Sequence, residues 1–546
     1  MEQGSFKKSM TGLWQLARPD SWRIIIRCLT GMLNIAASLL FVWLSKSLVD
    51  IASGDSDASL PVYVAALIGV MLVQFGTNLF ASYYEGVITV RATSEMRSMV
   101  FERVMRSRWD GREAFHSGDM VNRMEEDIQV VVDLICSRFP DIIITLMYLI
   151  ASSLYLLSLS PGLMWLLVGL MCVAVLCSKL YFKTIRRLTQ AIRQKESEVQ
   201  GFIQENILHR VVALTLSGVG NVLERMSRSQ EEVVGLTTRR LRCGLISRGF
   251  MSLGFAAGYA SAFLWGIFGI RSGAVTFGGM TAFLQLVGRV QTPISNLSRH
   301  VPAFIHALTS VDRVLELTGL AQESYGNPSY ISGVPGISVD NVTYRYPQQE
   351  KRVLDSFSFD FKPGSITAIM GETGAGKSTL MRLILSLLHP ENGAISLYNE
   401  NGDRIPVSAD TRCNFMYVPQ GNSLMSGTVR QNFLMACPDA TDAEMTEALK
   451  TAEAGFVLEL PDGLDTLCGE EGTGLSEGQS QRIAIARALL HPGSILILDE
   501  STSALDSATE RAVLANLHSR CRGVRTVLFV SHREAVSEWA DIVLRL

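Results

Sequence analysis

Charged residues are scarce in this sequence, and closely paired cysteines are missing from it. Asp, Glu, Lys and Arg make up 18% of the 546 residues, whereas soluble globular proteins carry about 25%. The nine cysteines include no C-x-x-C pair, which is typical of reduced, buried thiols rather than of a zinc or disulfide framework. No basic arm or stripe dominates either half, which disfavours a nucleic-acid partner. A purely soluble protein is not expected.

Six segments are long and apolar enough to cross a bilayer, which takes about 20 residues. The predicted spans are residues 24–49, 60–84, 139–157, 161–181, 250–270 and 274–297. Two long connections between them, 85–138 and 183–248, are rich in Arg, while the short connections are not. The positive-inside rule therefore places both termini and the long connections in the cytoplasm. Residues 1–318 are predicted to form an all-α, six-helix domain of the cell membrane, with helices that continue into the cytoplasm.

The composition changes after this membrane domain. Residues 1–335 carry 31 Lys and Arg against 25 Asp and Glu, whereas 336–546 carry 18 against 27. Gly, Ser, Pro and Asn cluster between the two halves, which predicts a linker at 319–335. Beyond it, apolar runs that suit buried strands alternate with helical patterns. Residues 336–546 are therefore predicted to form a soluble α/β P-loop domain around a largely parallel sheet, on the cytoplasmic side.

The sharpest motif is GETGAGKST, which fits G-x-x-x-x-G-K-[ST] between an apolar strand and a helix. Its glycines let backbone N–H groups and the helix N-terminus face phosphates, Lys377 is expected to reach the β- and γ-phosphates, and Ser378 to bind Mg²⁺. The predicted ATP-binding residues of this loop are Gly371, Glu372, Thr373, Gly374, Ala375, Gly376, Lys377, Ser378 and Thr379. ATP and Mg²⁺ are therefore the expected ligands.

Two carboxylates follow a run of four aliphatic residues in ILILDE. They stand at the carboxyl end of a predicted buried strand, the edge at which open α/β sheets bind ligands. Asp499 is expected to hold Mg²⁺ through water, and Glu500 to act as the general base that polarises the attacking water. A solvated acidic turn is the alternative, but it does not explain the preceding aliphatic run.

A further phosphate-binding helix end is predicted at GTGLSEGQSQR. Ser476 and Gln479 have the spacing of a capping box, so the helix is expected to begin at Glu477 and to direct free N–H groups outward. Such a helix end attracts anions. Capping alone would account for helix stability, but not for the glycine-rich entry that leads to Gly478.

At this point the chain resembles the ATP-binding-cassette (ABC) transporters, and in particular exporter half-transporters with six membrane helices and one nucleotide-binding domain. Leu475–Gln479 matches the family signature L-S-G-G-Q at four of five positions. The resemblance covers nearly the whole chain, and it implies that Ser476, Gly478 and Gln479 contact ATP. The order and spacing of several shorter elements agree with it.

These elements receive roles from the resemblance alone. Tyr346 resembles the aromatic residue that stacks on adenine, and Gln420 resembles the glutamine that contacts Mg²⁺ and water. His532 resembles the switch histidine that senses the γ-phosphate. Asp506, a further expected ATP-binding residue, closes a D-loop-like segment at 503–506, and 469–472 resembles the exporter loop beside the signature. Glu500, His532 and Gln420 are thus the expected catalytic residues, and Ser378, Gln420 and Asp499 the expected Mg²⁺ ligands.

The resemblance also implies a partner. Two such chains hold two ATP molecules between them, each bound by one P-loop and the other chain's signature, while the membrane helices alternate between inward- and outward-facing states. Residues 115–119 and 205–212 lie where the family places short helices that contact the cassettes, although they could be simple hairpin tips. Since Glu500 and His532 are both kept, we expect a homodimer rather than a heterodimer with a specialised partner.

Two departures from the family pattern are visible. Glu477 replaces the usual glycine of the signature, which favours the helix dipole but places a negative charge near a triphosphate. The sequence ends at ADIVLRL, soon after His532, where the family typically adds a further turn, strand and helix. The resemblance therefore does not extend to the edge of the cassette.

The cargo is the least determined feature. In the sixth span, a polar stripe at helical spacing consists of Thr281, Gln285, Arg289 and Thr292. Such a stripe either faces a water-filled substrate path, or Arg289 extends to the cytoplasmic boundary. The expected function is ATP-driven export of an amphipathic or hydrophobic drug, lipid or peptide. A membrane ATPase that acts as a sensor or gated channel is the alternative.

Overall fold

The computed structural model describes residues 3–18, 21–109, 117–346, 351–372, 374–469 and 474–546. The chain divides into two compact units, which we treat separately. The first comprises Met1–Phe101 and Met120–Thr318, and the second comprises Glu102–Asp119 and Gly319–Leu546. Thr373, residues 115–116 of the first expected contact helix and most of the segment 469–472 lie outside the described residues.

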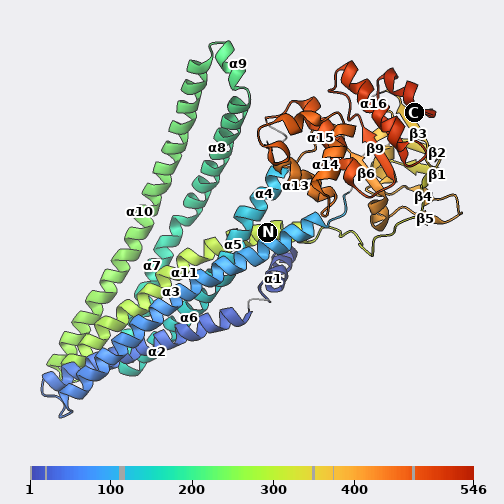
Figure 1. Ribbon diagram of the computed structural model, residues 1–546. Coiled ribbons are helices and arrows are strands. Elements are labelled where there is room, and N and C mark those ends of the chain that lie inside the picture. Colours follow the sequence, from blue (N-terminus) through green and yellow to red (C-terminus); the bar gives the residue numbers. More distant parts are fainter. Residues whose placement is uncertain (1–2, 19–20, 110–116, 347–350, 373, 470–473) are drawn as a thin grey trace. The chain divides into compact units, whose positions relative to one another are not determined.

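The first unit is helical throughout (Figure 1). Its helices are α1 (Gln3–Ala17), α2 (Ser21–Ala52), α3 (Leu60–Met105), α4 (Ser117–Asn122), α5 (Ile128–Asp133), α6 (Phe139–Leu159), α7 (Pro161–Leu180), α8 (Phe182–Leu208), α9 (Arg210–Thr215), α10 (Val219–Arg271) and α11 (Phe277–Thr318). The six predicted spans fall on α2, α3, α6, α7, α10 and α11. The last span begins three residues later than expected, after a turn in which Gly273 has a φ of +73°.

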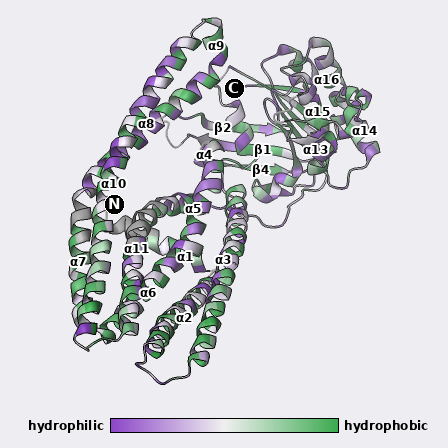
Figure 2. Ribbon diagram, turned by 90° about the vertical axis from the view of Figure 1, so that its left-hand side faces the viewer, coloured by the Kyte–Doolittle hydropathy of each residue, from purple (hydrophilic) through white to green (hydrophobic). Residues whose placement is uncertain are grey.

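Four helical stretches in the described part of the chain are long and apolar enough to cross a membrane: Ser21–Ala52, Leu60–Met105, Asp119–Leu159 and Val219–Arg271. Figure 2 shows hydrophobic residues concentrated along α2, α3, α6 and α7, whereas α8 is largely polar. Large apolar side chains on α3 are open to the surroundings; Leu72 and Phe75 are 65% and 64% exposed. Such exposure is unfavourable in water and suits contact with lipid.

Packing inside this unit joins α2, α6, α7, α10 and α11. Val42, Leu156, Leu167 and Leu286 form part of one fully buried cluster. Ion pairs also join these helices at the predicted cytoplasmic boundary. There the guanidinium of Arg27 lies 2.7 Å from Glu85 and 2.8 Å from Asp141. This network links α2, α3 and α6 through charges that compensate one another.

The described residues of the second unit form three sheets, of which the smallest is the two-stranded pair β7-β8. The parallel sheet has the order β11-β3-β10-β9-β6, and the antiparallel sheet has the order β2-β1-β4-β5. The strands are β1 (Gly336–Tyr344), β2 (Leu354–Phe361), β3 (Ile366–Met370), β4 (Asn392–Tyr398), β5 (Arg404–Pro406), β6 (Phe415–Val418), β7 (Gly427–Thr428), β8 (Leu467–Cys468), β9 (Ile495–Asp499), β10 (Thr526–Val530) and β11 (Ile542–Arg545). All five residues of β9 are buried, as are those of β10, which explains their aliphatic sequences.

The segment ADIVLRL forms the edge strand β11 of the parallel sheet. Ile542 pairs with Thr367 of β3, and the backbone N–H of Leu546 donates to Met370. Residues 542–545 thus form a strand that pairs in register with β3.

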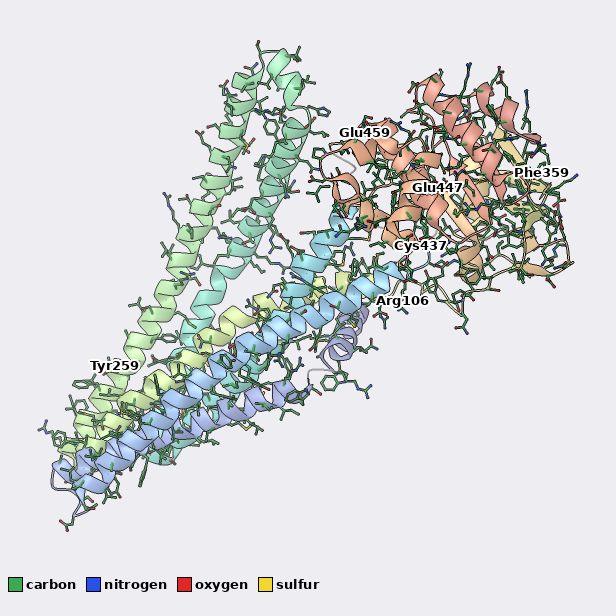
Figure 3. All side chains as sticks on the ribbon, in the orientation of Figure 1. Arg106, Tyr259, Phe359, Cys437, Glu447 and Glu459 are labelled. Carbon is green, nitrogen blue, oxygen red and sulfur yellow. The ribbon has the colours of Figure 1, made fainter. Side chains whose placement is uncertain are left out.

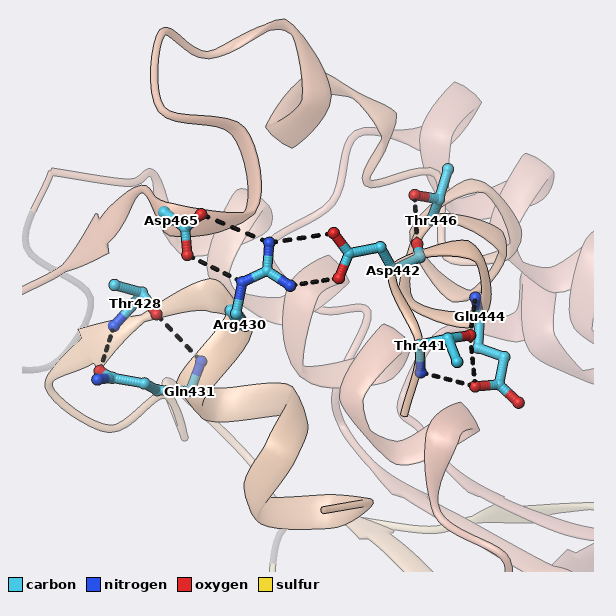
Figure 4. A network of polar contacts seen from close by, with 8 residues as sticks. All are labelled: Thr428, Arg430, Gln431, Thr441, Asp442, Glu444, Thr446 and Asp465. Atoms are coloured by element: carbon cyan, nitrogen blue, oxygen red, sulfur yellow. Dashed lines mark hydrogen bonds and ion pairs between the residues drawn. The ribbon is translucent and has the colours of Figure 1, made fainter. Parts of the chain in front are cut away.

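Five α-helices accompany these sheets: α12 (Lys377–Ile384), α13 (Val429–Ala436), α14 (Asp442–Thr451), α15 (Glu477–Leu490) and α16 (Ser507–Cys521). Capping boxes begin α13 and α14, at Thr428 and Thr441 (Figure 4). Between them, Arg430 pairs with Asp442 and, at 2.9 Å, with Asp465. The hydrogen bond from Arg430 lowers the pKa of Asp442, so this pairing stays charged at neutral pH.

The linker region is paired with the end of α3, within the second unit. Arg106, labelled in Figure 3, accepts a hydrogen bond from Glu323 N at 2.9 Å, and Arg108 N donates to Ala321 O at 2.8 Å. The carboxylate of Glu323 binds both terminal nitrogens of Arg412, at 2.6 and 2.7 Å. Arg412 also donates to the carbonyls of Leu385 and Ser386, just after α12. The start of the linker is therefore an ordered part of the second unit.

Candidate active site

The GETGAGKST loop lies between β3 and α12, as the sequence predicted. Gly374 and Gly376 have φ values of +90° and +99°, which side-chain-bearing residues rarely adopt. The ammonium of Lys377 is buried and donates to the carbonyls of Gly371 and Glu372 at 2.8 and 2.9 Å. The loop thus curls around the lysine, and α12 begins at Lys377 with its free N–H groups beside it.

Tyr346 lies beside this loop. Its hydroxyl is 3.2 Å from the hydroxyl of Thr379 and accepts a hydrogen bond from Arg382 at 3.3 Å. The guanidinium of Arg382 in turn lies 5.0 Å from the ring centre of Trp109. Tyr346, the residue expected to stack on adenine, is therefore held at the start of α12 by two residues of that helix.

Glu500 connects two other residues of the expected catalytic set. Its carboxylate accepts a hydrogen bond from Gln420 Nε2 at 2.6 Å and lies 2.7 Å from His532 Nε2. These residues follow β9, β6 and β10, three neighbouring strands of the parallel sheet. Glu500 has a φ of +50°, a conformation that costs about 1–3 kcal/mol for a non-glycine residue and recurs at functional sites. The topology thus brings the three residues to one edge of the sheet.

Asp499 is the last residue of β9 and is 3% exposed. Burial, and then the neighbouring charge of Glu500, raise the pKa of its carboxyl group. Its Oδ1 is buried and has no hydrogen-bond partner among the described residues, while Oδ2 accepts from Tyr417 at 3.4 Å. A buried carboxylate with a free oxygen requires a partner.

Mg²⁺ fits this requirement. The Ser378 hydroxyl is close enough to Asp499 to offset a small part of the rise in its pKa by hydrogen bonding, and Gln420 follows the adjacent strand β6. Hydroxyl, amide and carboxylate oxygens are the ligands that Mg²⁺ prefers, usually together with substrate phosphates. No cluster of three His, Cys, Asp or Glu residues that could hold a metal occurs in the described parts of the chain. Water and substrate phosphates usually complete the coordination of Mg²⁺.

The signature segment forms the predicted capping box. Gln479 N donates to Ser476 Oγ at 3.2 Å, Ser476 N donates to Gln479 Oε1 at 2.8 Å, and α15 begins at Glu477. The close approach of another loop requires glycine at position 478, because a Cβ atom there would lie 2.9 Å from the carbonyl oxygen of Ala504. Glu477 is exposed and is not constrained in that way.

Two residues that the sequence analysis did not single out hold the segment 503–506. Gln481 of α15 accepts from Ala504 N at 3.2 Å, and its amide donates to Ser503 Oγ at 3.3 Å. Arg533 donates to the carbonyls of Ser503 and Leu505 at 2.7 and 3.2 Å and pairs with the buried Glu510. Asp506 caps α16 and has a lowered pKa, because its carboxylate accepts hydrogen bonds from Thr509. Helix α15 and Arg533 are thus connected through hydrogen bonds to the same loop, residues 503–506.

Different surroundings are found for three residues of the polar stripe in the sixth span. The hydroxyl of Thr281 donates to Gly278 O of its own helix at 2.8 Å. Gln285 Oε1 is buried without a hydrogen-bond partner among the described residues. Arg289 reaches another helix, where it donates to the hydroxyl of Tyr148 at 3.0 Å.

Comparison with known protein families agrees with the two units. Residues 24–294 match the family model of the ABC transporter transmembrane region, and residues 354–503 match the ABC transporter family model. The chain belongs to the ABC transporters. Both regions in one chain identify it as an exporter-type half-transporter, as the signature and the P-loop suggested. An ABC transporter of this kind hydrolyses ATP.

Several relatives resemble this ABC transporter along most of its length. An ATP-dependent lipid A-core flippase of Ralstonia nicotianae is 27% identical over 563 residues, which cover 100% of this chain and 92% of the flippase. An ABC multidrug transporter of Aspergillus fumigatus is 27% identical over 557 residues, covering 99% and 70%. The solved structure of a bacterial Atm1-family ABC exporter with ATP bound superposes with a TM-score of 0.79 at 22% identity, covering 96% and 94%. The predicted fold class is confirmed.

Proposed function

We propose that this ABC transporter exports an amphipathic or hydrophobic molecule, such as a drug, lipid or peptide, across the cytoplasmic membrane by alternating access. The relatives named as a lipid A-core flippase and a multidrug transporter support this class of cargo. The basic long connections and the cassette would face the cytoplasm, in keeping with the positive-inside rule.

The contact of Glu500 with both Gln420 and His532 carries the proposed hydrolysis mechanism. Glu500 would accept a proton from the attacking water, whose oxygen bonds to the γ-phosphorus while the β–γ bridging oxygen leaves with ADP. Gln420 and His532 orient the carboxylate, and Lys377 neutralises β- and γ-phosphate charge. Ser378, Gln420 and Asp499 would hold Mg²⁺, and the bound ion would supply positive charge next to the phosphate oxygens.

We propose a second copy of the same chain as the partner. In such a pair, Ser476, Gly478 and Gln479 of one chain complete the ATP site formed by the P-loop of the other. The tip around α9 supports an interface with a further chain, because Leu208, Val211 and Leu216 are 77%, 72% and 75% exposed there. This tip includes the predicted contact segment 205–212, and exposed apolar clusters of this kind mark interaction sites.

Glu500→Gln tests the mechanism. We expect it to reduce steady-state ATP hydrolysis by about 100-fold or more, because general bases contribute roughly 10²–10⁴ in rate, while ATP still binds. Lys377→Ala should instead weaken ATP binding itself. Both are measured by phosphate release and by titration with a fluorescent ATP analogue in proteoliposomes.

Two outcomes would contradict these assignments. Turnover of Glu500→Gln within a few fold of the parent would remove Glu500 as the general base, and unchanged affinity of Lys377→Ala would remove the P-loop assignment. Cargo-stimulated hydrolysis without directional transport would favour a sensor or gated channel over an exporter.

A further inference from the structure

Arg289 is a membrane-span cation whose charge is not compensated within the described residues. Arg27 on α2 has two carboxylates within 2.8 Å. Arg289 on α11, by contrast, has a neutral hydroxyl partner in Tyr148 and lies 6.0 Å from the ring centre of Phe41; no carboxylate oxygen of the described residues lies within 4.0 Å of it. A charge within a membrane span is unfavourable unless it is paired or serves a ligand path.

A cavity of about 250 Å³ lies beside this cation, between α2, α6 and α11. Its polar wall consists of Asn34, Ser38, Thr145, Tyr148, Thr292 and Asn296. The hydroxyl of Tyr148 is 3.1 Å from Ser38 Oγ and 3.0 Å from Arg289 Nη1. Arg289 therefore contacts the wall directly, and Thr292 follows it by three residues on the same helix face.

The groups around this cavity suit an anion. A guanidinium has five N–H donors, and one of those of Arg289 is used by Tyr148. The others can bind two oxygens of a phosphate or carboxylate side by side. Of the wall groups, the Asn34 amide donates one of its two N–H bonds to Asn78 at 2.7 Å, which leaves the other N–H for an anion.

The size of the cavity sets what part of a cargo it can hold. Pockets for drug-sized ligands measure about 300–1,000 Å³, so this one suits a head group rather than a whole molecule. Ile35, Ile144 and Pro293 provide apolar lining next to the polar wall. We propose that this cavity binds the anionic head group, a phosphate or carboxylate, of an amphipathic cargo, with Arg289 as its charge partner. This inference rests on the proposed export function and specifies its substrate class.

The experiment uses three probes that separate the head group from the chain. The full-length protein is placed in phosphatidylcholine nanodiscs, and ATP hydrolysis is titrated with oleoyl lysophosphatidic acid, with neutral monooleoylglycerol and with glycerol 3-phosphate. We expect half-maximal stimulation by the lysophosphatidic acid at a concentration at least tenfold lower than by either other probe. Charge-assisted hydrogen bonds contribute about 1.5–3 kcal/mol, which corresponds to roughly tenfold to 100-fold in affinity.

Variants then separate the charge from a purely structural role. Arg289→Ala should raise the half-maximal concentration of lysophosphatidic acid by about tenfold or more and leave that of monooleoylglycerol within twofold. Arg289→Lys should recover part of the loss, and Tyr148→Phe should give a smaller shift because the charge remains. Arg271→Ala is the matched control, because it removes an exposed arginine at the C-terminal end of α10, and Arg271 does not line the cavity. It should change neither half-maximal concentration.

Three results would overturn the inference. An equal shift for both oleoyl probes in Arg289→Ala would make Arg289 a packing residue, and a preference for monooleoylglycerol would exclude an anionic head. Equal stimulation by glycerol 3-phosphate would indicate a soluble anion instead. Transport of Hoechst 33342, a hydrophobic cationic dye, is measured in parallel, so that export without a response to the anion contradicts this inference and leaves the proposed function standing.

Discussion

Gly478→Ala is expected to separate folding from catalysis in the cassette. The new Cβ atom would lie 2.9 Å from Ala504 O and 3.3 Å from a methyl group of Leu505. The loop cannot move away freely, because Gln481 and Arg533 hold its backbone. Either the signature end of α15 or the loop 503–506 must therefore shift by some tenths of an ångström.

The expected magnitudes follow from this contact. Overpacking costs about 1–3 kcal/mol, and the better helix propensity of alanine offsets about 1 kcal/mol of it. The free energy of unfolding should therefore fall by about 0–2 kcal/mol. Turnover should fall by at least about tenfold, since a misplacement of about 1 Å can reduce a rate by roughly 100-fold.

Thermal unfolding and phosphate release at saturating ATP measure the two effects on the same preparation. Glu477→Ala is the matched control, because Glu477 is the neighbouring residue on α15 and is exposed; its turnover should stay within twofold of the parent. If Gly478→Ala also hydrolyses ATP within twofold of the parent, the close contact with Ala504 does not constrain catalysis.

Three further predictions concern the signature, the linker and the assembly. Glu477→Gly should leave phosphate release equal or modestly higher, because it removes a negative charge near the triphosphate; a large loss would reveal a specific role for the carboxylate. Burial would raise the pKa of Glu323, but hydrogen bonds from Arg412 and Tyr325 lower it overall. The charged carboxylate therefore stabilises the fold above about pH 4.3, and this stabilisation is lost as the pH falls through the lowered pKa. Glu323→Gln should therefore reduce stability by about 1–3 kcal/mol at pH 7 and flatten the acid dependence in urea unfolding, and an unchanged acid dependence would refute this. The chain purified alone in nanodiscs should have the mass of two copies and hydrolyse ATP, whereas inactive single copies that need another half-transporter would contradict the homodimer.

Local sequence signals predicted the elements that depend on neighbouring residues. The P-loop between β3 and α12 required only the glycine spacing and the flanking apolar run, and the capping box of Ser476 and Gln479 required only a three-residue interval. The strand that ends in Asp499 was visible because a buried parallel strand is aliphatic on both faces. By length and hydropathy alone, four helical stretches of the described residues could cross a membrane, which is fewer than the six predicted spans.

Contacts between distant segments were not predictable in this way. Arg533 pairs with Glu510, 23 residues away, and binds two carbonyls of the loop 503–506. Without knowledge of the sheet topology, Arg533 would be predicted to be a solvent-exposed residue. The polar stripe shows the same limit, since the spacing grouped Thr281 with Arg289. In the structure Thr281 bonds within its own helix and Arg289 bonds to α6, a difference set by the neighbouring helices rather than by the spacing.

The length of α10 has a mechanical consequence. Its 53 residues form one uninterrupted helix of about 80 Å, at about 1.5 Å per residue. Residues 219–249 precede the predicted span, so about 45 Å of it extends beyond the hydrocarbon layer. Tilting a rigid rod of that length by about 5° displaces its far end by about 4 Å. The helix therefore acts as a lever, and a small reorientation within the bilayer becomes a displacement at α9 comparable to the width of a side chain.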